Sequence, residues 1–249
     1  MGGLLRVEVV KVVRRRAMLV SCAGVALAAV LALFVISYAL HVEDEAANPS
    51  VGGGSGMDAT AAVLAGLALV IGSLIGARAG AFDQETQVIR YWAMLGTPRA
   101  ALLGVRLPAA CLVAFAALLP ALVVGVGASA VLSAETGDGL SAGDVGSATW
   151  SVAVAAVLWT GLGVGIGALL GSTGAGIAVA LAVALIGAPA LSALQLLWSP
   201  LEAGPLGNAQ FVLEGSGGYG PVWAAILVAL AWVGAPMAGA AMRLRRAEL

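Results

Sequence analysis

Six long apolar runs divide the chain, and they constrain its fold more than any other feature of the sequence. The runs occupy residues 17–40, 59–81, 108–132, 148–170, 175–198 and 220–242. None carries Asp, Glu, Lys or Arg near its middle. A helix rises about 1.5 Å per residue, so each run can cross a hydrocarbon core of roughly 30 Å. We therefore predict an all-α integral membrane protein with about six transmembrane helices, organised as a single transmembrane domain over residues 1–249.

The composition excludes an ordinary soluble domain. Hydrophobic residues make up 61% of the chain and charged residues 10%, whereas a soluble domain carries about 25% charged residues. A soluble fold of this length could not bury so much apolar surface, but a bilayer accepts it directly. Six spans and their short connections leave no residues for a separate soluble domain.

The positive charges follow a pattern that predicts orientation. All twelve Lys and Arg residues fall in the N-terminal segment, in residues 78–107 or in the C-terminal tail. The loops at 41–58, 133–147 and 199–219 contain none of them. Six spans would put these two sets of segments on opposite faces, and the positive-inside rule assigns the basic set to the cytoplasm. We predict a multi-pass protein of the cytoplasmic membrane with both termini in the cytoplasm.

The segment before the first span, residues 4–16, has the pattern of a helix that lies in the membrane interface. Its apolar residues at helical spacing are Leu5, Val9, Val12 and Val13. We expect an interfacial amphipathic helix on the cytoplasmic side; a frayed basic leader fits the same residues. The apolar run that follows is longer than the core of about 7–15 residues in a secretory signal. We therefore interpret this run as a retained first span.

Small residues are dense in two of the predicted spans. Glycines recur every four residues in the run 59–81, at Gly72, Gly76 and Gly80. The glycines of the run 148–170 and its end are Gly161, Gly163, Gly165, Gly167 and Gly171. Such ladders let helix backbones approach closely. They predict tight packing, either within the chain or across a dimer face.

The segment 191–219 is too apolar for a plain loop. Pro189 with Gly187 marks a place where the preceding span can break, because proline removes a backbone donor. We expect short helices here that re-enter the outer leaflet. Irregular backbone persists at that depth only where protein or water covers it.

Residues 82–107, which we call the coupling segment, carry more helix signals than a connection between two spans requires. Asp83 can cap a helix that runs to about Leu95, and Gly96 fits the position that ends it. Pro98 fits the first position of a second helix, which continues into the next span. The arginines on this second helix are Arg99 and Arg106. The pattern favours an intracellular docking element for another protein; a mere amphipathic connection is the alternative.

The whole layout resembles the membrane subunit of type-2 ABC exporters. The likeness is specific in sequence only over residues 85–106, where "E…LGTPRAALLGVRL" is similar to that family's stretch between spans 2 and 3. The resemblance implies that a coupling helix here receives motion from an ATPase subunit. It also implies re-entrant helices at 191–219 and a connecting helix at 4–16. The docking residues that it implies are Asp83, Glu85, Gln87, Arg90, Gly96, Pro98, Arg99 and Arg106.

The sequence places ATP hydrolysis in another chain. A P-loop requires GxxxxGK[ST], and the only lysine, Lys11, has no such context. We therefore expect a permease that is not itself an enzyme. The family's usual assembly implies separate P-loop ATPase subunits and a second membrane subunit, in a homodimer or a heterodimer. An accessory or scaffold membrane protein without transport is the alternative, since the spans offer no ionised binding group.

Candidate catalytic and metal-binding groups are few. Cys22 and Cys111 lie in apolar runs, form no CxxC pair and have the pattern of small buried hydrophobic residues. His41 is the single histidine. A zinc site needs further His or acidic ligands, and an intramembrane protease needs a serine nucleophile beside its histidine base. We expect no catalytic residue, no metal, no cofactor and no nucleic-acid partner; lipid is the expected surrounding.

Overall fold

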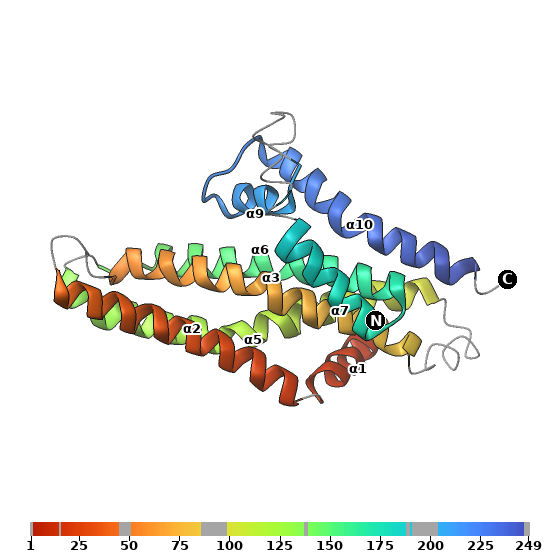
Figure 1. Cartoon of the computed structure of the whole chain (residues 1–249), viewed down its shortest axis with the longest axis horizontal. Coiled ribbons are helices and arrows are strands. Elements are labelled where there is room, and N and C mark those ends of the chain that lie inside the picture. Colours follow the sequence, from red (N-terminus) through yellow and green to blue (C-terminus); the bar gives the residue numbers. More distant parts are fainter. Residues whose placement is uncertain are drawn as a thin grey trace. The chain divides into compact units, whose positions relative to one another are not determined.

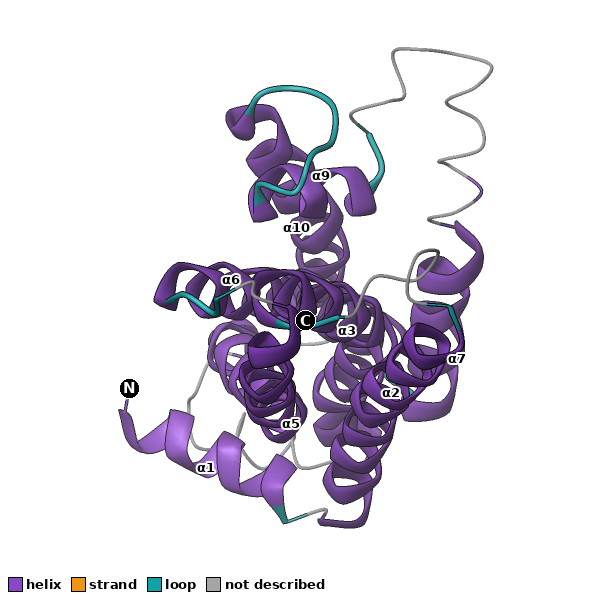
Figure 2. Cartoon of the chain, turned by 90° about the vertical axis from the view of Figure 1, so that its left-hand side faces the viewer, coloured by secondary structure: helices purple, strands orange, loops and turns teal. Residues whose placement is uncertain are grey.

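The fold of the described residues is entirely helical, as Figures 1 and 2 show. A computed structural model describes residues 2–14, 16–44, 51–85, 99–136, 139–187, 190 and 204–246. The helices are α1 (Gly2–Val13), α2 (Arg16–Glu43), α3 (Gly53–Glu85), α5 (Arg99–Thr136), α6 (Ala142–Leu170), α7 (Thr173–Ala182) with a π turn η1 (Val183–Gly187), α9 (Leu206–Glu214) and α10 (Val222–Arg246). Within these ranges there is no strand, which confirms the all-α prediction for the described part of the chain.

Five of these helices are long and apolar enough to cross a membrane. The crossing segments are Arg16–Glu43, Gly53–Phe82, Gly104–Ala134, Ala142–Leu170 and Val222–Arg243. They match five of the six predicted spans and make the chain a multi-pass membrane protein by length and composition. Of the remaining predicted span, 175–198, the structure describes the shorter apolar helix Thr173–Gly187 and residue 190. The six-span topology and the side of each terminus stay predictions.

The chain forms two compact units. Unit 1 consists of Met1–Arg14, Ala68–Ala114 and Val154–Leu249, and unit 2 of Arg15–Leu67 and Phe115–Ala153. The long helices α3, α5 and α6 each contribute one part to either unit. The organisation as a single transmembrane domain stays a prediction.

Unit 2 packs α2 and the first half of α3 against the second half of α5. Glycine is needed where α3 and α5 meet. A Cβ added to Gly56 would lie 2.6 Å from Ser129 Oγ, and one added to Gly125 would lie 2.4 Å from Thr60 Cγ2. Phe34 of α2 is buried beside the same crossing. Small side chains of one helix thus pack against glycines of the other, as is common between membrane helices.

Unit 1 is built on the contact between the second half of α3 and α6. A Cβ on Gly76 would lie 2.2 Å from the Thr160 carbonyl oxygen. From the other side, a Cβ on Gly167 would lie 2.0 Å from the Ala77 carbonyl oxygen. Such distances are far below a normal contact, so each helix presses its backbone against the backbone of the other.

The glycines of α6 face two directions. Gly163 and Gly167 face α3, whereas Gly161 and Gly165 face α10, where Val233 and Pro236 approach them. The glycine ladders therefore pack helices of this chain against one another. Of the two interpretations of the ladders, the structure confirms packing within the chain.

The short helix α9 lies within the segment 191–219 that was expected to contain re-entrant helices. It contacts α10 and ends at Gly215, whose φ of 76° is left-handed, where Ser216 N–H donates to the Phe211 carbonyl oxygen. Residues 191–203 lie outside the described residues. A helix in this segment is thus confirmed, and its depth in the membrane stays a prediction.

Candidate functional site

The helix ends of unit 1 meet around the turn between α6 and α7. Gly171 leaves α6 with a φ of +69°, a left-handed conformation that glycine adopts without strain. Ser172 is the N-cap of α7, and its hydroxyl accepts from Ala175 N–H at 3.5 Å. The four residues GSTG at 171–174 separate two apolar runs. The turn is the point on which the other helix ends converge.

The last turn of α3 reaches both sides of this turn. Gln84 Nε2 donates to the Ala168 carbonyl oxygen at 2.7 Å, which satisfies one of the open carbonyls at the end of α6. The Glu85 carboxylate accepts from Thr173 N–H at 3.3 Å and from the Thr173 hydroxyl. A carboxylate at the first residue of α7 also suits the positive end of that helix dipole.

The end of α10 completes the arrangement. Arg243 donates to the Leu169 carbonyl oxygen, so that a positive charge lies at the negative end of the α6 dipole. A Cβ on Gly171 would lie 2.6 Å from Gln84 Oε1 and 3.3 Å from Arg243 Nη1. We call this set the α6–α7 junction: Gln84, Glu85, Ala168, Leu169, Gly171, Ser172, Thr173 and Arg243. It connects α3, α6, α7 and α10.

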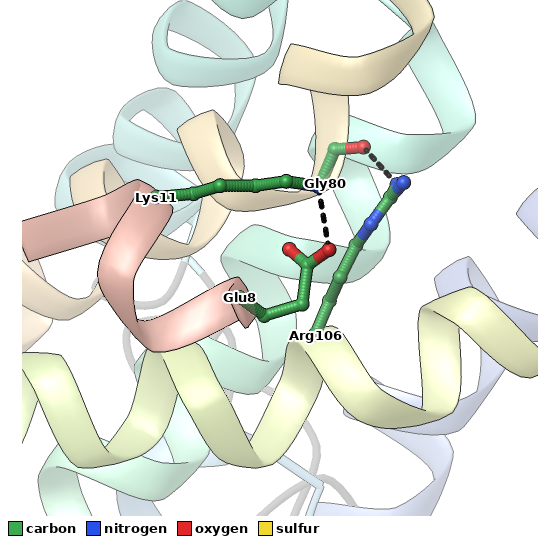
Figure 3. Close-up of polar contacts among 4 residues, drawn as sticks. All are labelled: Glu8, Lys11, Gly80 and Arg106. Carbon is green, nitrogen blue, oxygen red and sulfur yellow. Dashed lines mark hydrogen bonds and ion pairs between the residues drawn. The ribbon is translucent and has the colours of Figure 1, made fainter. Parts of the chain in front are cut away.

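Arg106 lies inside unit 1 rather than on its surface. Its side chain is 1% exposed, and Nη1 donates to the Gly80 carbonyl oxygen at 3.5 Å. Figure 3 shows Arg106 and Gly80 beside Glu8 and Lys11 of α1, which form an ion pair at 2.7 Å. Arg106 thus ties the start of α5 to the end of α3. This burial favours an internal role for Arg106 over direct docking on another protein.

Only some of the predicted docking residues lie among the residues that the structure describes. Asp83 lies inside the last turn of α3, which continues to Glu85. The prediction that Asp83 caps a new helix is therefore wrong. The second predicted helix is confirmed as α5, which starts at Arg99 and runs unbroken through the span to Thr136. The docking residues that lie outside the described residues are Gln87, Arg90, Gly96 and Pro98.

Sequence reasoning missed three contributors to the junction. Gln84, Thr173 and Arg243 carry no motif, and Gln84 meets Ala168 from 84 positions away. Only the position of these residues next to the ends of apolar runs could have pointed to them. Arg243 follows an apolar run on the predicted cytoplasmic side, and Thr173 is the first residue after a capping serine.

A second buried polar contact lies in unit 1 away from the junction. Trp159 Nε1 of α6 donates to Gln210 Oε1 of α9 at 2.7 Å, and both side chains are buried. The Gln210 side chain also hydrogen-bonds to Glu214, and burial raises the pKa of the Glu214 carboxyl above its ordinary value. Trp232 Nε1 of α10 donates to the Gly204 carbonyl oxygen. These bonds hold α9 against α6 and α10.

Across the described ranges, the structure contains no group of three His, Cys, Asp or Glu side chains that could hold a metal ion. Comparison with models of known protein families finds no match, and comparison with curated proteins finds none either. On physical grounds, we take the α6–α7 junction as the candidate functional site, together with the coupling segment, to which its Gln84 and Glu85 belong.

Proposed function

We propose that this chain is the transmembrane permease subunit of an ATP-driven exporter of the type-2 ABC class. It would work in the cell membrane with six spans and both termini in the cytoplasm. The observation that carries the proposal is the link from Glu85 to Thr173. Gln84 and Glu85 belong to the coupling segment itself, so a push on that segment acts on residues already bonded to α6 and α7.

The glycine contacts explain how such a push would travel. Because the backbones of α3 and α6 touch at Gly76 and Gly167, no side chain or gap separates the two helices there. A displacement of this part of α3 toward α6 would therefore act directly on the α6 backbone. Glu85 and Arg243 would pass that motion to α7 and α10 through the junction. A direct helix contact of this kind is the element such a transporter needs between its motor and its substrate path.

The partners follow from the same proposal. Separate P-loop ATPase subunits would bind the coupling segment, and a second membrane subunit, identical or different, would complete the substrate path. Since Arg106 is buried and Glu85 already bonds Thr173, direct contact with the ATPase falls mainly to Asp83, Gln87 and Arg90. Gly96, Pro98 and Arg99 would shape the turn into α5.

Co-purification tests the proposal. The tagged full chain is purified from its own host in mild detergent, and bound proteins are examined for a P-loop ATPase. We expect one to be retained by the wild type and lost from the Asp83→Asn, Arg90→Gln double variant. Asp58→Asn is the matched control, because Asp58 is an exposed aspartate in the first turns of the same helix.

Three results decide the outcome. Loss of the ATPase in the double variant alone supports docking through the coupling segment. Equal retention by all variants contradicts the docking assignment. A wild-type chain that brings no nucleotide-binding protein favours the accessory or scaffold function, for which the lack of ionised groups near the middle of the predicted spans is the supporting observation.

A further inference from the structure

The helix α1 exposes a face that is both apolar and basic. Val7, Val10 and Val13 are 45%, 43% and 44% exposed, and Arg6 and Arg14 are exposed beside them. At 100° per residue these five positions fall within one sector of the helix. The half-buried residues form the opposite sector: Leu5, Glu8, Val9, Lys11 and Val12. Of the apolar face predicted from the sequence, Leu5, Val9 and Val12 are half-buried, whereas Val13 belongs to the exposed sector. A second apolar face, with Val7, Val10 and Val13, is left outward.

The charged residues of α1 also differ between its inner and outer sectors. Glu8 is the only acidic residue of this helix. It lies on the inner side, paired with Lys11, and the two side chains are 14% and 27% exposed, respectively. Figure 3 shows this pair beside Arg106 and Gly80. Both charges that remain on the outer sector, Arg6 and Arg14, are therefore positive.

Chain connectivity links α1 to a helix that can cross a membrane. α1 ends at Val13, and the membrane-crossing helix α2 begins at Arg16. Three peptide steps span at most about 11 Å, so the C-terminal end of α1 stays close to the first residue of α2. An exposed apolar and basic face beside the end of a membrane-crossing helix is typical of a helix that contacts the membrane interface.

We propose that the outer sector of α1 binds the anionic headgroups of membrane lipids. Its valines would enter the boundary between headgroups and acyl chains, and Arg6 and Arg14 would hold lipid phosphates. Arginine suits this task because its planar guanidinium forms paired hydrogen bonds to phosphate oxygens. A zwitterionic headgroup presents a phosphate as well, but its cationic group cancels the long-range attraction, so the site would select net anionic lipid. The site does not depend on the transported cargo or on an ATPase partner.

The test measures lipid binding at α1 in the purified full chain. A bimane fluorophore is attached at Val10→Cys in a Cys22→Ala, Cys111→Ala background, and the protein in neutral detergent micelles is titrated with phosphatidylglycerol. We expect a saturable change in bimane emission and a much smaller one with phosphatidylcholine. Arg6→Gln with Arg14→Gln should lower the apparent affinity about thirtyfold, and each substitution alone about fivefold. Added salt should weaken binding in the unsubstituted protein.

The matched control is Glu8→Gln with Lys11→Gln, which removes two charges from the inner sector without changing the net charge. Its affinity for phosphatidylglycerol should equal that of the parent, with folding checked by circular dichroism. Equal binding by the Arg6, Arg14 double variant and the parent would overturn the proposal. So would equal responses to the two lipids. If the double variant instead loses a co-purifying protein while its lipid titration is unchanged, the face belongs to a protein partner and the proposal is wrong.

Discussion

Replacing Gly76 by Ala tests whether the contact between α3 and α6 is as close as the structure indicates. The new methyl carbon would lie 2.2 Å from the Thr160 carbonyl oxygen and 2.9 Å from Val164 N. Both are backbone atoms of α6, so no side-chain rotation can relieve the clash. A carbon and a carbonyl oxygen approach to about 3.3 Å at the closest, so the helices would have to separate by about 1 Å.

The expected cost can be isolated with a control on the same helix. Gly66 also lies within α3, and a Cβ there would meet nothing within 4 Å. Both replacements gain the helix propensity of alanine, about 1 kcal/mol. Only Gly76→Ala forces two packed backbones apart, and overpacking of this kind costs about 1–3 kcal/mol. Gly76→Ala should therefore be less stable than Gly66→Ala by about 1–3 kcal/mol, or about 2–12 °C in Tm for a chain of this size.

The assay is thermal unfolding of the purified full chain in one detergent, followed by tryptophan fluorescence with circular dichroism as a second probe. Coincident transitions in the two probes justify a single Tm for each variant. The reasoning is refuted if Gly76→Ala and Gly66→Ala shift Tm equally, because α6 would then yield at no cost. An equal rise in Tm for both variants would show that propensity alone decides stability in this helix.

Three further predictions concern the junction and α9. Glu85→Gln removes the carboxylate at the start of α7 and should reduce ATP-driven transport while the ATPase still co-purifies; equal loss of both would show a docking role instead. Glu214 has a pKa raised by burial, so the folded state binds its proton more tightly than the unfolded chain does. The stabilisation that the protonated Glu214 carboxyl provides is complete below its unfolded-state pKa and is lost as pH rises through its folded-state pKa. As pH rises between these two pKa values, Tm should fall in the wild type and stay level in Glu214→Gln. Trp159→Phe leaves a buried amide oxygen on α9 without its indole donor and should cost about 1–3 kcal/mol in unfolding experiments, whereas the exposed Trp150→Phe on the same helix should change little.

The apolar runs predict the crossing helices because a bilayer requires long, uncharged segments and little else. They predict the helix ends poorly. The run at 59–81 belongs to a helix that spans Gly53–Glu85. Gly53 and Gly54 are poor helix formers, yet the helix includes them. Gly53 is the first residue of this helix and has a φ of 58°, a left-handed conformation that glycine adopts without strain. A Cβ at the neighbouring Gly52 would lie 2.7 Å from the Leu132 backbone, so glycine is required by the packing at this helix end.

Contacts with residues far away in the sequence explain why the prediction at Asp83 was wrong. A local pattern of an acidic residue before an amphipathic stretch is typical of a helix start. In the structure, the bonds of Gln84 and Glu85 to α6 and α7 accompany the continuation of α3 past Asp83. These partners lie more than eighty positions further along the chain. No window of neighbouring residues contains that information, so the junction could not be read from the sequence.

The positive-inside rule predicts the side of the membrane on which the cationic residues lie, but not the contacts that each of them makes. The positive-inside pattern groups all twelve cations without distinguishing their tasks. In unit 1, Arg243 donates to a carbonyl oxygen at the end of α6, Arg106 donates to a carbonyl oxygen within α3, and Lys11 pairs with Glu8. Arg6, on the outer sector of α1, is exposed. A charge that closes a helix end inside the fold should affect stability when it is neutralised. A charge on the outer sector should affect lipid binding and leave stability unchanged, so the two groups separate by measurement.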